Sequence, residues 1–146
     1  MGHSDTDWPS VLHVPSIGLV VAGDVVYNGY HHVESATGGI RAWMKALDTV
    51  AALQPRNVVA GHRNQDLGDD PKAIGETRCY SEDAERLIAK SKTAHEYYDA
   101  MIKLYPDRLN PGAVWFWGGK RSSRTEFKSG RSRRAAAGDV KAGRRR

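Results

Sequence analysis

Two short apolar runs of nearly the same composition stand out in the pattern of apolar and polar residues. Gly18–Asp24 is Gly-Leu-Val-Val-Ala-Gly-Asp and Asn57–His62 is Asn-Val-Val-Ala-Gly-His, so Val-Val-Ala-Gly occurs twice. Continuous valine-rich runs that end at glycine are typical of strands buried on both faces. A helical pattern of apolar residues lies between the runs, and this order predicts a strand, a crossover helix and a parallel strand.

Other apolar patterns predict the elements beside these runs. Ser10–Val14 is expected to form a short strand, and the turn signal Pro15-Ser16 would let it pair antiparallel with Leu19–Ala22. After Gly38-Gly39, apolar residues at helical spacing predict a helix that ends near Pro55. The pattern therefore predicts an α/β fold with a mixed sheet and flanking helices.

The rest of the chain carries clear helix signals but weaker strand signals. Val25–His32 is rich in aromatic and polar residues, which favours a loop. Asp69-Asp70-Pro71 is a typical helix start, with proline at the first helical position. Thr93-Ala94-His95-Glu96 matches a capping box and predicts a helix that ends before Pro106. Ala113–Trp117 is expected to be either a last strand or a packed aromatic segment.

The composition changes at residue 119 and divides the chain into two parts. Ser, Arg, Gly and Ala dominate residues 119–146, which contain eleven basic and two acidic residues, a net charge of +9. Residues 1–118 contain eleven basic and fifteen acidic residues, a net charge of −4. We therefore expect a folded domain over residues 1–118 and a basic, disordered tail over residues 119–146. The overall charge of +5 is no sign that the folded part binds nucleic acid.

The single cysteine and the start of the chain favour a cytoplasmic protein. Cys79 alone cannot form an internal disulfide, which is compatible with a reducing compartment. Met1–Asp7 lacks the basic and apolar regions of a signal peptide, and no apolar run has the length of a membrane span. No contact with a membrane is expected.

Candidate metal ligands follow the two buried runs directly. Because parallel neighbouring strands present their carboxyl ends at one edge of a sheet, Asp24 and His62 are expected to lie on the same rim. A carboxylate and an imidazole are suitable ligands for a divalent transition metal, and His3 is a possible third ligand. On spacing alone, a turn aspartate, a hydrogen-bonded histidine and a frayed terminus are the favoured alternative.

The order and surroundings of several motifs resemble one enzyme family. Gly2–Trp117, about four-fifths of the chain, is similar to the C-terminal half of the metallo-β-lactamase-fold hydrolases. The matching motifs are Gly2-His3-Ser4-Asp5-Thr6-Asp7, Val11-Leu12-His13-Val14-Pro15, Gly18–Asp24 with Val25-Val26-Tyr27-Asn28-Gly29, Val59-Ala60-Gly61-His62, and Tyr105-Pro106-Asp107-Arg108 with Asn110-Pro111-Gly112. The resemblance implies that His3 binds a first zinc ion, Asp24 bridges two zinc ions and His62 binds the second.

The family's signature, His-x-His-x-Asp-His, has no match in these 146 residues. In the family this motif lies in the N-terminal half and supplies four further ligands, so the chain corresponds to half of an αββα sandwich. The resemblance implies that any zinc binding by the three remaining ligands is weak, and that one apolar sheet face lacks its partner. A truncated product of a longer hydrolase would contain this set of motifs.

Tyr27, Asn28, His31 and His32 follow the predicted bridging aspartate, where the family's substrate pocket lies. They are candidates to contact substrate, and a solvated loop is an equally good interpretation.

The resemblance implies zinc-dependent hydrolysis of a small molecule with an ester, thioester, lactone or β-lactam bond, once an N-terminal half completes the site. One alternative is a non-catalytic module that binds a complementing chain or a second copy of itself. Another is a protein that binds nucleic acid non-specifically through the arginines of residues 119–146.

Overall fold

The structure is a computed structural model that describes residues 8–32, 39–116 and 118. His3 and residues 119–146 lie outside the described residues, and so does the predicted disorder of the tail. Within the described ranges, no helix has both the length and the apolar character needed to cross a membrane.

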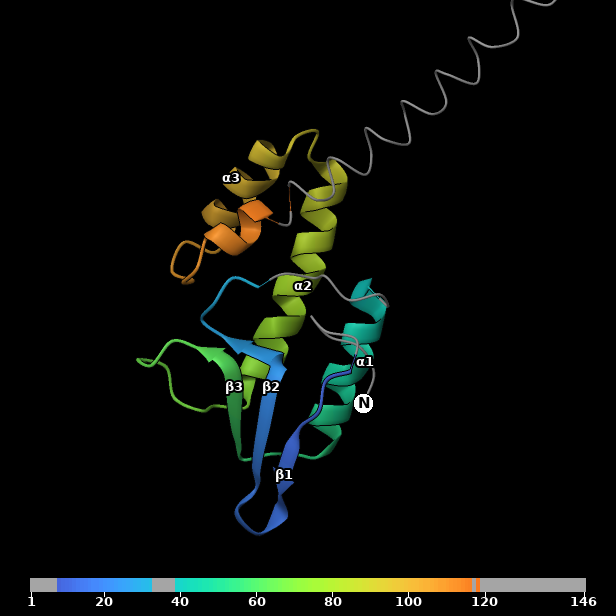
Figure 1. The fold of residues 1–146 in the computed structure, drawn as a ribbon, viewed down its shortest axis with the longest axis vertical. Coiled ribbons are helices and arrows are strands. Elements are labelled where there is room, and N and C mark those ends of the chain that lie inside the picture. Colours follow the sequence, from blue (N-terminus) through green and yellow to red (C-terminus); the bar gives the residue numbers. More distant parts are fainter. Residues whose placement is uncertain (1–7, 33–38, 117, 119–146) are drawn as a thin grey trace, which may run out of the picture.

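A three-stranded mixed sheet carries the two repeated runs (Figure 1). The strands are β1 (Leu12–Val14), β2 (Leu19–Asn28) and β3 (Asn57–Arg63), and a short 3-10 turn, η1 (Pro15–Ile17), joins β1 to β2. β1 pairs antiparallel with β2, and β2 pairs parallel with β3. These findings confirm the predicted hairpin and the predicted parallel pair.

The predicted loop over Val25–His32 is wrong for its first half, because β2 continues to Asn28. Tyr27 pairs with His62 and Asn28 with Arg63, so the ladder extends beyond the apolar run. Aromatic and polar residues remain in this strand because tertiary contacts satisfy them. The backbone N–H of Tyr27, for example, donates to the Thr77 hydroxyl over 3.0 Å.

Among the described residues, the helices α1, α2 and α3 accompany the sheet (Figure 1). α1 (Gly39–Ala52) is the predicted crossover helix, and α2 (Lys72–Lys90) begins one residue after Pro71, which is its N-cap. α3 (Ala94–Leu104) begins with the predicted cap, in which the Thr93 hydroxyl accepts from the Glu96 backbone N–H over 3.1 Å. Residues 112–116 are helical, so a last strand at this position is wrong.

The core has two clusters of buried apolar side chains. In the larger cluster, one face of the sheet packs against α1 and the start of α2 through Val20, Ala22, Val58, Ala60, Trp43, Leu47 and Ile74. The indole N–H of Trp43 donates to the Val25 carbonyl over 2.9 Å, which ties α1 to β2. The smaller cluster joins α2, α3 and the last helical turn through Tyr80, Ala84, Tyr97, Met101 and Val114.

The opposite face of the sheet is apolar as well but is much less buried. In the register of the sheet, Leu12 lies opposite Val21, Val14 opposite Leu19, and Val21 opposite Val59. These five residues form what we call the outer sheet face. Leu12 is 61% exposed and the other four are half-buried, whereas Val20 and Ala22 on the inner face are fully buried. The described residues therefore leave part of this apolar face uncovered.

Candidate metal centre

Asp24 of β2 and His62 of β3 lie side by side, as predicted, although Asp24 lies inside β2 and not at its carboxyl end. Nδ1 of His62 is 2.8 Å from Oδ1 of Asp24, within hydrogen-bonding distance. The side chains are 38% and 48% exposed for Asp24 and His62, so solvent reaches both. This hydrogen bond uses one polar atom of each side chain. Nε2 of His62 and Oδ2 of Asp24 are therefore the atoms that could bind a metal while the hydrogen bond is kept.

An irregular stretch of β2 brings Asp24 to this position. The register between β2 and β3 shifts between Val21 and Gly23, and again between Gly23 and Tyr27. Asp24 lies inside the second shift, and Gly23 before it has a φ of +52°, a conformation that glycine adopts without strain. Such bulges redirect side chains at sheet edges, and here the bulge accompanies the approach of Asp24 to His62.

Gly61 allows the close contact between the two strands. A Cβ atom at this position would lie 2.3 Å from Oδ1 of Asp24 and 2.8 Å from the carbonyl carbon of Gly23. Both distances are far below van der Waals contact, so only glycine fits beside this conformation of Asp24. The two glycines that precede the candidate ligands therefore have different roles, one conformational and one steric.

Tyr27 supports the imidazole of His62 from one side. The rings are stacked with an interplanar angle of 3° and a centroid distance of 5.1 Å. Because Tyr27 is only 5% exposed and its backbone is hydrogen-bonded to Thr77 of α2, its ring is a rigid surface. The ring of Tyr30 lies 6.0 Å from that of His62 at 55°. The imidazole therefore has a defined position before any ligand binds.

His31 and His32 are buried under α2. Nδ1 of His31 lies 3.0 Å from the Tyr80 hydroxyl, and Nε2 of His32 lies 3.1 Å from the Ser81 hydroxyl. Burial, and then the positive charge of Arg108, lowers the pKa of His31 to about 4. The same two causes hold the pKa of His32 well below its usual value. Both imidazoles are therefore neutral at pH 7.

The four candidate substrate residues are all nearly inaccessible in the described structure. Tyr27 is 5% exposed, and Asn28, His31 and His32 are 2%, 1% and 4% exposed. A solvated loop is therefore wrong as an interpretation of this segment. Their contact with a substrate stays a prediction, and what the structure shows is that they join β2 to α2 and to the neighbouring loops.

Among the described residues, the candidate ligands are of the kind that zinc binds, but they are too few for a zinc site. An imidazole and a carboxylate are ordinary zinc ligands, and a stable site needs three or four protein ligands. Among residues 8–32, 39–116 and 118, no group of three or more His, Cys, Asp or Glu side chains could hold a metal ion. The predicted third ligand, His3, lies outside these residues. A zinc site at Asp24 and His62 therefore needs ligands from elsewhere.

Two residues that organise this region carry no signal of that role in the sequence. Thr77 bonds to both backbone groups of Tyr27, and the guanidinium of Arg108 donates to the Tyr30 carbonyl over 2.8 Å. Both residues are far from β2 in the sequence and belong to no metal-binding pattern. Only Arg108 is part of a motif, the Tyr-Pro-Asp-Arg segment of the family resemblance.

Comparison with known proteins supports the fold that these elements suggest. No protein-family model and no curated protein matches the sequence. A similar solved structure is that of a metallo-β-lactamase family protein from Thermus thermophilus, with a TM-score of 0.52 and 18% sequence identity. The match covers 88% of this chain and 43% of the Thermus chain.

The chain has part of a metallo-β-lactamase fold, which confirms the fold inferred from the sequence. It spans less than half the length of the Thermus protein. At 18% identity, this similarity concerns the fold alone.

Proposed function

We propose that this chain contributes part of the metal centre of a metallo-β-lactamase-fold hydrolase. One observation carries the proposal: Asp24 and His62, from two parallel strands, lie 2.8 Å apart on an accessible edge of the sheet. The hydrolysed bond is an ester, thioester, lactone or β-lactam. The remaining ligands come from His3 and from a segment with the family's His-x-His-x-Asp-His motif.

The roles of the residues follow from their positions. Asp24 and His62 would hold the metal, and bound zinc supplies a water of lowered pKa and a positive charge beside the substrate. Tyr27 fixes the plane of the His62 ring by stacking on it. The hydrogen bond to Asp24 fixes the rotation of the same ring within that plane. Gly61 leaves the room that the Asp24 carboxylate needs.

Zinc titration of the 146-residue chain tests this proposal. Isothermal titration calorimetry would compare the chain with the Asp24→Ala and His62→Ala variants. Loss of a supporting residue alone weakens metal binding about 10- to 100-fold, so loss of a ligand should weaken it at least as much. His95→Ala is the matched control, because His95 is exposed on α3. Equal zinc affinity in all four proteins would contradict the proposal.

A second candidate function is that of an interaction module without catalysis. The outer sheet face favours it, because five apolar side chains lie there with Leu12 61% exposed. Its proposed occupant is the complementary sheet of a metallo-β-lactamase sandwich, since the Thermus protein is more than twice as long as the matched region. Zinc-independent binding of such a half-domain, lost in Leu12→Lys, would support this function. Nucleic-acid binding through residues 119–146 stays a prediction.

A further inference from the structure

A cavity of about 550 Å³ lies beside α2, apart from the Asp24–His62 pair. Its walls come from the segments that follow β2, β3 and α3, and from α2 itself. Neither Asp24 nor His62 lines it, and its surface is mostly apolar. Its volume is within the range of sites that hold small organic molecules. The cavity therefore has the size of a ligand site and is separate from the candidate metal centre.

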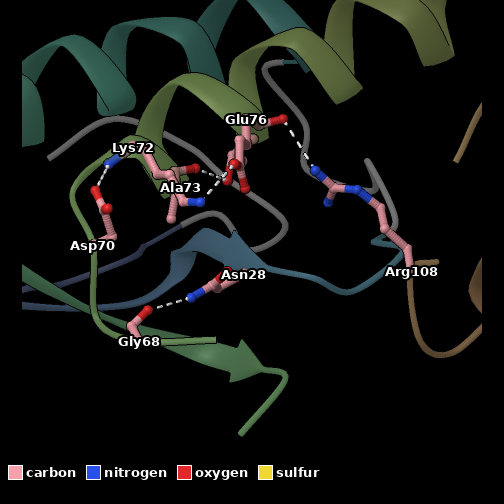
Figure 2. A network of polar contacts seen from close by, with 8 residues as sticks. Asn28, Gly68, Asp70, Lys72, Ala73, Glu76 and Arg108 are labelled. Atoms are coloured by element: carbon pink, nitrogen blue, oxygen red, sulfur yellow. Dashed lines mark hydrogen bonds and ion pairs between the residues drawn. The ribbon is translucent and has the colours of Figure 1, made fainter. Parts of the chain in front are cut away.

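Arg108 lines this cavity, and its guanidinium is fixed on several sides. Its Nη1 donates to the Tyr30 carbonyl over 2.8 Å and its Nη2 to the Glu76 carbonyl over 3.3 Å. Figure 2 shows the Arg108 side chain reaching the backbone of α2. The guanidinium also lies over the rings of Tyr80 and Tyr105, 4.7 and 5.1 Å from their centroids. It is therefore a preorganised cation.

Arg108 forms no ion pair with a carboxylate among the described residues. Its hydrogen bonds there go to neutral carbonyl groups and use two of the five guanidinium N–H donors. Two carboxylates also line the cavity, and neither forms an ion pair with Arg108, although the charge of Glu76 acts on the guanidinium from a distance and favours its charged form. Glu76 forms an ion pair with Lys72 at 3.8 Å, and Asp107 is exposed, where solvent screens its charge. A half-buried cation without a directly paired carboxylate favours an anionic ligand.

Gly75 opens the cavity on the side of α2. Lys72, Gly75 and Cys79 are spaced by three and four residues, so they lie on one face of the helix, and all three line the cavity. A Cβ atom at Gly75 would have no heavy atom within 4 Å. Glycine inside a helix costs about 0.5–1 kcal/mol relative to alanine. The fold therefore has a glycine at the place where a larger side chain would fill the cavity.

We propose that this cavity binds a small organic monoanion in which a carboxylate is attached to an apolar group. The carboxylate would accept hydrogen bonds from Arg108, and the apolar part would pack against Leu67 and the open face at Gly75. The guanidinium fork matches a carboxylate in geometry, and the mostly apolar wall offers a contact surface for the rest of the ligand.

Cys79 is a built-in reporter for this site, because it is the single cysteine of the chain and lines the cavity. The reaction rate of its exposed thiol with a neutral disulfide reagent such as 4,4′-dithiodipyridine would be measured with octanoate, octanol or inorganic phosphate present. We expect octanoate to slow the reaction at concentrations where octanol and phosphate do not. Equal protection by octanol would overturn the role of the charge, and equal protection by phosphate the role of the apolar body.

Two variants and one matched control locate the ligand by calorimetric titration with octanoate. Gly75→Leu should abolish binding by filling the cavity, while Gly75→Ala, its matched control, should leave most of it. Arg108→Lys should weaken binding about tenfold, since lysine lacks the guanidinium fork. Thermal unfolding would verify that Arg108→Lys is folded. If Arg108→Lys is unfolded, the binding measured with Gly75→Leu decides the test. Undiminished binding by Gly75→Leu would overturn the proposal, whatever the outcome of the zinc titration.

Discussion

At the scale of single residues, Gly61 determines whether Asp24 and His62 can meet. A methyl group at position 61 would lie 2.3 Å from the Asp24 carboxylate, so Gly61→Ala must displace either that side chain or the backbone at Gly23. Overpacking of this kind costs about 1–3 kcal/mol. We therefore expect a lower free energy of unfolding in urea and weaker zinc binding.

Gly75→Ala is the matched control for this prediction, because its new methyl group meets no atom within 4 Å. It should raise the stability by about 0.5–1 kcal/mol, through the higher helix propensity of alanine. If both variants change the stability in the same direction, the steric role of Gly61 is wrong.

A second prediction at this scale concerns the pH dependence of stability. The pKa of His31 lies at about 4 in the folded protein and at about 6.5 in the unfolded chain, because the native site is buried and near Arg108. Between these values the unfolded chain binds a proton that the folded protein excludes. The free energy of unfolding should therefore fall as the pH falls from about 6.5 to 4, and the lowered pKa of His32 acts in the same direction.

Urea unfolding at several pH values would measure this effect. His31→Gln should have a smaller slope of stability against pH in that window, because one of the two groups is gone. Tyr80→Phe removes the hydroxyl group near Nδ1 of His31 but keeps the site buried. Its slope should match that of the unchanged protein, since burial is the larger cause of the lowered pKa. An unchanged slope in His31→Gln would refute the assignment of this pH dependence to His31.

At the scale of elements, Thr77 connects the end of β2 to α2. Its hydroxyl oxygen accepts from the Tyr27 N–H over 3.0 Å and lies 3.0 Å from the Tyr27 carbonyl oxygen and 2.7 Å from that of Ala73. Thr77→Val keeps the shape but leaves the buried backbone groups of Tyr27 without this partner, which costs about 1–3 kcal/mol. Thr49→Val makes the same change at an exposed position of α1 and should stay within about 0.5 kcal/mol. Equal losses in the two variants, measured by urea unfolding, would contradict this role.

The elements also show what could and could not be predicted before the structure was known. The repeated Val-Val-Ala-Gly runs predicted the parallel pair and the proximity of Asp24 and His62. Asp24 nevertheless lies inside β2 and not at its carboxyl end, so the irregular stretch of β2, and not parallel topology alone, brings the two side chains together. The extension of β2 to Asn28 could not be predicted, since it depends on Thr77, about fifty residues away. The bulge at Asp24 depends in the same way on the register with β3.

At the scale of the whole molecule, the outer sheet face shows that the described residues do not complete a sandwich. Its five apolar residues lie on adjacent strands, in contrast to the inner face, which α1 and α2 cover (Figure 1). The matched region is 43% of the Thermus chain, so that protein contains a large remainder beyond it. Contiguous apolar surface of this kind associates with other apolar surface when it has no partner.

The last prediction is therefore concentration-dependent self-association of the isolated 146-residue chain through the outer sheet face. Leu12→Lys should shift sedimentation velocity profiles toward the monomer, because it places a charge opposite Val21 in the middle of that face. It should cost little stability, since Leu12 is already 61% exposed. Leu104→Lys, at an exposed leucine of α3, is the matched control and should leave association unchanged. If Leu104→Lys shifts the chain toward the monomer and Leu12→Lys does not, the associating surface lies on the helices. The interpretation of the outer sheet face as the uncovered face of a sandwich then fails.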